Sequence, residues 1–195
     1  MKKGKIEWGN MKKKAIALLI LAVIGAAVFA IPNPSRLTIS PTVARQEIRY
    51  DRHYVNKATI GPGLSLDYYY HLDDNKALGG SLAAGYYNYK DFHYYVDTRL
   101  VGQFKFRAFN FDLGGEKSLA LNLFAGIGAG LAVRDDKNWG VYGVLKGGFS
   151  VDFNTRSGIG GSLGIDASIS FQNDESAVAQ YSLSLGLIVP LGGKK

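Results

Sequence analysis

Apolar residues recur at every second position along most of this 195-residue chain, from Leu37 onward. Side chains of a β-strand point alternately to its two faces, so this period predicts strands with one face in an apolar medium. The chain is therefore predicted to be all-β, with eight strands. Six segments show the period strongly and two show it weakly: 60–70, 94–108, 119–133, 141–153, 159–171 and 181–191, then 36–44 and 77–88.

The breaks between these segments are rich in Asp, Asn, Gly and Ser, the residues that favour turns. All are short except 45–57, and short connections join antiparallel neighbours as hairpins. We therefore expect an antiparallel meander forming one domain. The short breaks are 71–76, 90–93, 110–117, 135–138, 154–158 and 173–176.

The two faces of the predicted strands differ in a way that separates a soluble barrel from a membrane barrel. No charged residue stands on the apolar face of the six strong segments, whereas the opposite face holds Gly, Ser, Ala and a few charges. Small residues suit the crowded interior of an eight-stranded barrel. Hydrocarbon cannot hydrogen-bond to a sheet edge, so strands that span it must close. The prediction is an eight-stranded, antiparallel, up-and-down transmembrane β-barrel, with aromatic girdles where Tyr and Phe gather near the segment ends.

Residues 12–30 have the features of a secretory signal peptide, with Lys12–Lys14 before sixteen uncharged, mainly apolar residues. Cleavage is expected after Ala30, because a stretch of this length falls short of the roughly 20 residues that an anchor helix needs. The expected organisation is a signal peptide at 1–30 and an outer-membrane barrel domain at 31–195. Met1 and Met11 both remain open as the start of translation.

Composition and isolated motifs exclude several classes of function. Most of the net charge of +7 lies in the leader, and residues 31–195 carry only +2, which gives no support to nucleic-acid binding. The absence of Cys excludes disulfides, thiolate metal sites and a lipid-anchored N-terminus. His53, His71 and His93 are isolated, without metal-ligand spacing. We therefore expect no catalytic, cofactor or metal site.

The mature chain resembles the small eight-stranded outer-membrane barrels of the OmpA-barrel, OmpX, OmpW and opacity type. Its last segment is similar to the assembly signal of that family, a pattern of polar, Gly and apolar residues carried here by Ser184, Gly186, Val189 and Leu191. The resemblance implies a multi-pass protein of the cell outer membrane with both termini in the periplasm. It also implies three partners: membrane lipid with lipopolysaccharide or its equivalent, the barrel assembly machinery, and an extracellular or host ligand.

The charged residues on the inward face are the first candidate site. They form a predicted lumen network in which Lys146 and Asp166 lie directly opposite each other in a hairpin centred on Arg156. Such charges either plug the lumen as salt bridges or line a narrow conduit. The network comprises Asp67, Asp97, Arg99, Lys105, Arg107, Lys146, Asp152 and Asp166.

The long connection 45–57 is the second candidate site, a basic and aromatic surface loop for an anionic ligand. Its candidate residues are Arg45, Arg49, Tyr50, Arg52, Tyr54 and Lys57. Two functions remain open. The protein is either a structural or adhesin-like barrel with a largely plugged lumen, or an OmpW-like conduit for small or apolar solutes. Pro41 and Pro62 predict either that the hydrocarbon boundary lies below them, toward the periplasm, or that a bulge or gap separates the first two strands. Such a gap would be the site of a lateral exit.

Overall fold

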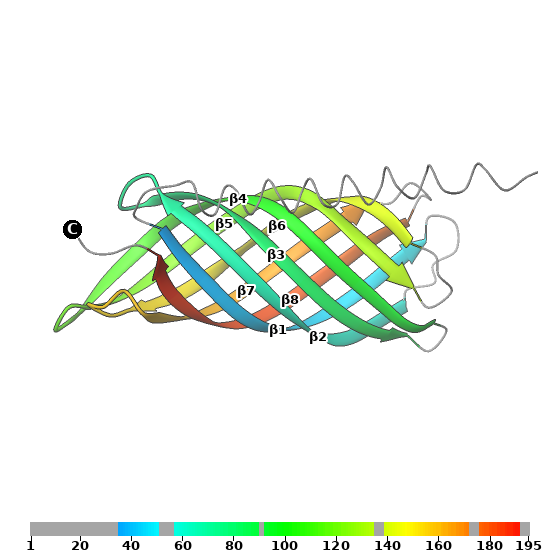
Figure 1. The fold of residues 1–195 in the computed structure, drawn as a ribbon, viewed down its shortest axis with the longest axis horizontal. Coiled ribbons are helices and arrows are strands. Elements are labelled where there is room, and N and C mark those ends of the chain that lie inside the picture. Colours follow the sequence, from blue (N-terminus) through cyan, green and yellow to red (C-terminus); the bar gives the residue numbers. More distant parts are fainter. Residues whose placement is uncertain (1–34, 51–56, 90–91, 135–138, 172–175, 192–195) are drawn as a thin grey trace, which may run out of the picture. The chain divides into compact units, whose positions relative to one another are not determined.

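The computed structural model describes residues 35–50, 57–89, 92–134, 139–171 and 176–191, which form a closed barrel of eight antiparallel strands (Figure 1). The predicted strand number and fold class are confirmed. Within these ranges, no helical segment has the length and apolarity needed to cross a membrane. The strands are β1 (Ser35–Tyr50), β2 (Lys57–His71), β3 (Lys76–Tyr89), β4 (Phe92–Gly114), β5 (Lys117–Arg134), β6 (Trp139–Asn154), β7 (Gly160–Phe171) and β8 (Ser176–Leu191).

Each strand pairs with its neighbour in the sequence, and the pairing of β1 with β8 closes the sheet. Ser35 faces Tyr70 on one side and Leu191 on the other, so both ends of the barrel domain lie at one end of the barrel. We call this the turn end, because it also carries the turns 72–75, 115–116 and 155–159. The opposite end is the loop end. The leader 1–30, with Ala30, lies outside the described residues.

Two predicted connections turn out to be largely strand. β1 runs to Tyr50 and β2 begins at Lys57, so only 51–56 separate them. β4 runs to Gly114 rather than ending near 108, because the hairpin turns on the two residues Gly115 and Glu116, which have φ of 60° and 63°. Two-residue turns of this kind match the twist of paired strands and keep them paired up to the turn.

The hairpin of β4 and β5 projects past β3 at the turn end (Figure 1). β4 pairs with β3 only as far as Phe106, after which the Arg107 amide donates to the Asn75 carbonyl at 2.7 Å. From Phe109 to Leu113 the strand pairs with β5 alone. Its edge toward β3 is therefore open.

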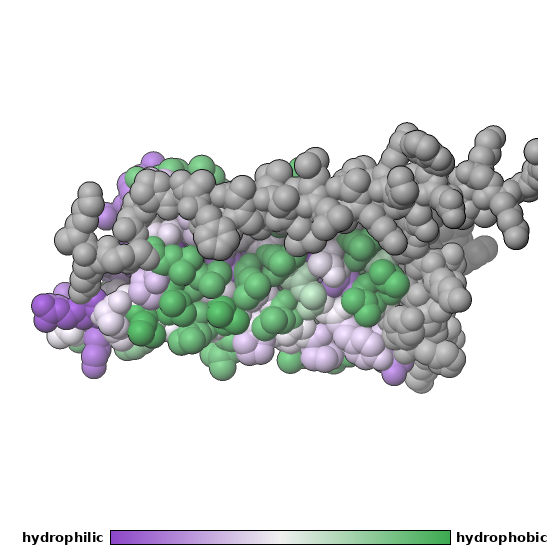
Figure 2. All heavy atoms as spheres, in the orientation of Figure 1, coloured by the Kyte–Doolittle hydropathy of each residue, from purple (hydrophilic) through white to green (hydrophobic). Residues whose placement is uncertain are grey.

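The outer surface of the barrel is apolar. Ile127 is 70% exposed and Leu185 67%, and large apolar side chains of all eight strands are similarly uncovered. Figure 2 shows hydrophobic residues gathered along the barrel wall, with hydrophilic ones at the turn end. Monomeric soluble proteins rarely expose contiguous apolar patches larger than a few hundred Å². The apolar surface and polar interior together make this a transmembrane β-barrel.

The prolines interrupt pairing, but at other places than predicted. β1 and β2 pair without a break through Pro41 and Pro62, so the expected gap between them is wrong. Instead, the β2–β3 pairing stops at Gly63 and Gly85, and the β1–β8 pairing lapses between Ile39 and Thr42. Each proline nitrogen faces away from the intact β1–β2 ladder. The hydrogen bond that proline cannot donate is therefore missing from the β1–β8 pairing at Pro41 and from the β2–β3 pairing at Pro62. The Thr59 hydroxyl donates to the Asn88 carbonyl at 2.7 Å and keeps β2 and β3 adjacent beyond this point.

Inward glycines are covered by tyrosine rings on neighbouring strands. A Cβ added to Gly79 would lie 2.7 Å from the Tyr69 ring, and one added to Gly130 would lie 2.3 Å from the Tyr142 ring. Tyr87 fills the space beside both Gly61 and Gly85. The rings occupy volume that the glycines leave, so these glycines do not open the lumen. They allow large side chains to lie flat against the inner wall.

Candidate functional site

The candidate site is the lumen, and all eight predicted lumen charges stand on inward-facing strand positions. They come from β2, β4, β6 and β7. Four of them form two close ion pairs, Arg99 with Asp97 and Lys105 with Asp152. These pairs and their polar neighbours cross the lumen at two levels.

The level nearer the loop end is centred on Asp97, whose side chain is 3% exposed. Its Oδ2 accepts hydrogen bonds from Arg99 Nε at 2.9 Å and from Gln46 Nε2 at 3.1 Å. The Tyr89 hydroxyl donates to Gln46 Oε1 at 2.8 Å, and the guanidinium of Arg99 also donates to Ser168 across the barrel. Side chains of β1, β3, β4 and β7 therefore meet in one network.

The level nearer the turn end is centred on Asp152. Lys105 Nζ lies 2.7 Å from Asp152 Oδ2, and the Ser162 hydroxyl donates to Oδ1 at 2.7 Å. Lys105 Nζ also lies 4.8 Å from the centre of the Tyr69 ring, within cation–π range. The Tyr69 hydroxyl in turn donates to Gln103 Oε1. Lys105 and Asp152 therefore neutralise each other at this level.

Between the two levels, Lys146 and Asp166 are brought together less closely than predicted. Lys146 Nζ is 3.8 Å from Asp166 Oδ2, too far for a direct hydrogen bond. The register pairs Lys146 with Ser168 and Gly148 with Asp166, so the two charges are diagonal rather than directly opposite. The predicted hairpin centre was wrong by one residue, because the connection 155–159 is centred on Ser157 and uses Gly158 at φ 80°.

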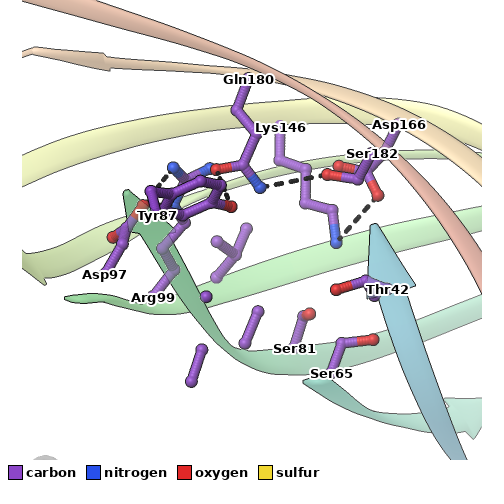
Figure 3. Close-up of a pocket in the computed structure, with 14 residues that line it drawn as sticks. Thr42, Ser65, Ser81, Tyr87, Asp97, Arg99, Lys146, Asp166, Gln180 and Ser182 are labelled. Atoms are coloured by element: carbon purple, nitrogen blue, oxygen red, sulfur yellow. Dashed lines mark hydrogen bonds and ion pairs between the residues drawn. The ribbon is translucent and has the colours of Figure 1, made fainter. Parts of the chain in front are cut away.

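Among the described residues, two small chambers of the lumen lie one on each side of the Lys146–Asp166 pair. Each has a volume of about 40 Å³, room for about three water molecules. Figure 3 shows the chamber nearer the loop end, with Tyr87, Arg99 and Gln180 on one side of the view and Lys146 and Asp166 on the other. The second chamber is bounded toward the turn end by Lys105 and Tyr69. Most of the side chains that line the two chambers are polar.

The neutral members of this network were not among the residues predicted from the sequence. Gln46, Tyr87, Tyr89 and Gln180 stand on inward positions, and the Tyr87 hydroxyl donates to Gln180 Oε1 at 3.0 Å. Their inward positions in the sequence indicated that they belong to the network, because polar residues on the inward face of a membrane strand need hydrogen-bond partners. The distances between strands that decide which partners meet could not be obtained from the period of two.

The candidate surface loop is only partly described. Arg45 and Lys57 lie within strands, and Arg45 makes an exposed ion pair with Glu47 at 2.8 Å. Arg49 and Tyr50 belong to the end of β1, while Arg52 and Tyr54 fall outside the described residues. The prediction of one long loop is wrong, since most of its candidate residues extend the β1–β2 hairpin.

The remaining predicted positions are placed as follows. Ser184 and Gly186 face the lumen from β8, and Val189 and Leu191 stand on its outward face. Their role as an assembly signal stays a prediction. In the described part of the chain, no three His, Asp or Glu side chains gather as a metal site would require. His71 ends β2, and the other two histidines fall on residues whose side chains are not described.

No protein-family model and no curated protein sequence matches the chain. Among solved structures, it is similar to the attachment invasion locus protein Ail of Yersinia pestis, with 16% identity, 80% of this chain and 100% of Ail covered, and a TM-score of 0.45. Neisserial surface protein A has 12% identity, coverages of 80% and 97%, and a TM-score of 0.49. The outer-membrane enzyme PagL has 19% identity, coverages of 79% and 99%, and a TM-score of 0.45. These similarities concern the fold, and no activity is carried over from them.

Proposed function

We propose that this chain is a non-enzymatic integral protein of the outer membrane, with a largely plugged polar lumen and a structural or surface-interaction (adhesin-like) role. The observation that supports it best is the pair of cross-lumen levels centred on Asp97 and Asp152. Each ties strands on different sides of the barrel together with charge-assisted hydrogen bonds. A solute passing through would have to break both.

The energetics favour a plug over a conduit. An Asp97 or Asp152 carboxylate separated from its cation would be a buried, unpaired charge, and breaking such a pair by removing one partner costs about 3–5 kcal/mol. The chambers between the levels hold only about three waters each, so an ion could not keep its hydration shell there. The charges therefore stabilise the closed barrel.

The proposed location has the turn end in the periplasm. The apolar wall would face lipid and lipopolysaccharide or its equivalent, and residues 1–30 would direct export, with cleavage after Ala30. The barrel assembly machinery would read the last strand, through Ser184, Gly186, Val189 and Leu191. The loop end would then face outward and meet an extracellular or host ligand, with Arg45 at the rim of that surface.

Planar-bilayer conductance tests the plug. The refolded barrel, identified by the faster gel migration of its unboiled form, should insert without producing discrete current steps. The matched positive control is Arg99→Ala combined with Lys105→Ala, which removes one cation from each cross-lumen level and should conduct. Reproducible steps from the unmodified protein would refute the plugged lumen and turn the inward charges into selectivity determinants.

The surface-interaction role has its own test. Retention of the refolded protein on an immobilised anionic glycan should fall when Arg45 and Arg49 are both changed to Gln. The control is Arg156→Gln, which removes an exposed cation at the opposite end of the barrel. Equal retention of all three proteins would refute ligand binding by the loop-end surface and leave only the structural role.

One observation favours the alternative, an OmpW-like conduit for small or apolar solutes. The β2–β3 pairing ends at Gly63 and Gly85, and the chamber nearer the loop end is lined by Gly85 and Tyr87 at this point. Tyr87 would then close a lateral route. Tyr87→Ala should speed entry of an apolar dye into liposomes. Tyr142→Ala, which uncovers Gly130 beside the unbroken β5–β6 ladder, should not. Equal rates in both would exclude this route.

A further inference from the structure

The turn-end mouth of the lumen carries more positive than negative charge. Arg36 from β1 and Arg107 from β4 face it, next to Lys105 and Asp152. Asn154, the hydrogen-bond partner of Arg36, stands two residues after Asp152 on the same face of β6, and Arg107 stands two residues after Lys105 on the same face of β4. Asp152 is the carboxylate that balances this group, and it is already bound to Lys105.

The two arginines have no carboxylate of their own in the part of the chain that the structure describes. Arg36 donates to the neutral amide of Asn154, with NH1 2.7 Å from Oδ1. Arg107 Nε is buried and has no hydrogen-bond partner among the described residues. Asp112, farther along the same strand, accepts the Gly114 amide at 2.8 Å within its own hairpin. The mouth thus holds two guanidiniums whose charge no carboxylate of these residues neutralises.

A buried donor without a partner is unfavourable, and two like charges near each other add repulsion. Both costs disappear if an anion with several acceptor oxygens binds between the guanidiniums. The guanidinium presents its N–H groups as a rigid fork that matches phosphate oxygens. A dianion would also balance the charge of two arginines. We propose that the turn-end mouth is a binding site for a phosphate group, held by Arg107 and Arg36.

The position suits phosphate from either of two sources. The site lies at the turn end of the lumen, so free phosphate or a small phosphorylated solute could reach it from the aqueous side. It also lies at the rim of the apolar wall, where Phe106 is exposed, so a phospholipid headgroup could reach it. The recognition chemistry is the same in both cases. The site does not depend on the lumen being plugged or open.

The test uses the refolded full chain in a phosphate-free, uncharged detergent, with the side-chain Nε–Hε signals of arginine followed by NMR as inorganic phosphate is added. Phosphate should shift the Arg107 and Arg36 signals saturably, and Arg107→Gln should weaken binding by about tenfold or more. The matched control, Arg156→Gln, removes an exposed cation from a turn at the same end and should bind like the unmodified protein. Unboiled gel mobility confirms that each variant is folded.

Three further results decide the proposal. No saturable shift at tens of millimolar phosphate, or equal weakening in Arg107→Gln and Arg156→Gln, would overturn it. If Arg107→Gln does not fold, Arg36→Gln is measured in its place. In nanodiscs of phosphatidylglycerol without free phosphate, a shifted Arg107 signal that added phosphate no longer moves identifies the lipid headgroup. An Arg107 signal that still titrates with free phosphate there identifies a soluble ligand.

Discussion

Lys105→Met is expected to destabilise the barrel more than Lys146→Met. Both substitutions replace a lumen lysine by a residue of nearly the same volume. Lys105→Met keeps the unbranched chain but removes the ammonium that lies 2.7 Å from Asp152 Oδ2. Asp152, whose side chain is 8% exposed, would keep only neutral partners such as Ser162. The carboxylate would then be a buried charge without a directly bound cation, since the nearby Arg36 is hydrogen-bonded to Asn154.

The expected loss follows from these contacts. Removing one partner of a buried pair costs about 3–5 kcal/mol. Losing the contact with the Tyr69 ring adds about 0.5–1 kcal/mol. We expect the free energy of unfolding to fall by about 3.5–6 kcal/mol in all. Lys146→Met is the matched comparison: its Nζ is 3.8 Å from Asp166, so the loss should be about half as large or less.

Reversible urea unfolding in lipid vesicles, followed by circular dichroism, measures both losses. The double variant Lys105→Met with Asp152→Asn removes the buried charge itself and should recover at least about 2 kcal/mol of the single variant's loss. A double variant as unstable as Lys105→Met would show that the loss comes from packing. An unchanged Lys105→Met would show that water or another group stabilises Asp152, and the plugged lumen would lose its main support.

Three other predictions follow from local geometry. Gly130→Ala places a Cβ 2.3 Å from the Tyr142 ring and should cost about 1–3 kcal/mol in the same unfolding assay, whereas Gly143→Ala, with open space around its Cβ, should cost less than about 1. The Ile60 amide lies beyond the end of the β2–β3 ladder and should exchange with deuterium faster than the amide of Leu66, which lies within it. Equal rates would mean that a hydrogen-bond acceptor outside the ladder protects Ile60. Backbone amides, first that of Asn75, hold the pKa of Asp73 below 3.8. Because the folded-state pKa of Asp73 is depressed, the carboxylate stabilises the turn fully at pH values above its unfolded-state pKa. This stabilisation is lost as the pH falls through the folded-state pKa. The NMR chemical shift of the Asn75 amide should follow the Asp73 titration, and it should not change with pH in Asp73→Asn.

The alternation of apolar residues was enough to predict the fold. Each strong segment, such as 119–133 within β5, became a strand whose apolar face is exposed, because in a membrane barrel the period of two reports directly on which face meets lipid. Strand ends were less predictable. Arg45 and Phe111 stand in strands although their segments looked like connections, since pairing with a neighbouring strand can extend a hairpin through polar residues.

The inward positions of the charges were also predictable, but their partners were not. Asp97, Lys105 and Asp152 were placed in the lumen by parity alone. Which of them meet depends on the stagger between strands, and an error of one residue in a hairpin centre moved Lys146 off the position opposite Asp166. Parity is a property of one strand, whereas a contact across the lumen depends on the register of every strand between the two residues.

The open edge of β4 from Phe109 to Leu113 raises the question of why such barrels do not join into fibres. An unpaired strand edge is a template for another strand, which must lie alongside it. Two barrels standing in one membrane have strands tilted by about 35–45° in the same sense, so the strands that face each other cross at about 70–90°. Their edges cannot align. The common orientation that the membrane imposes on every copy therefore protects this edge from polymerisation, and the protection ends when the protein is solubilised in detergent.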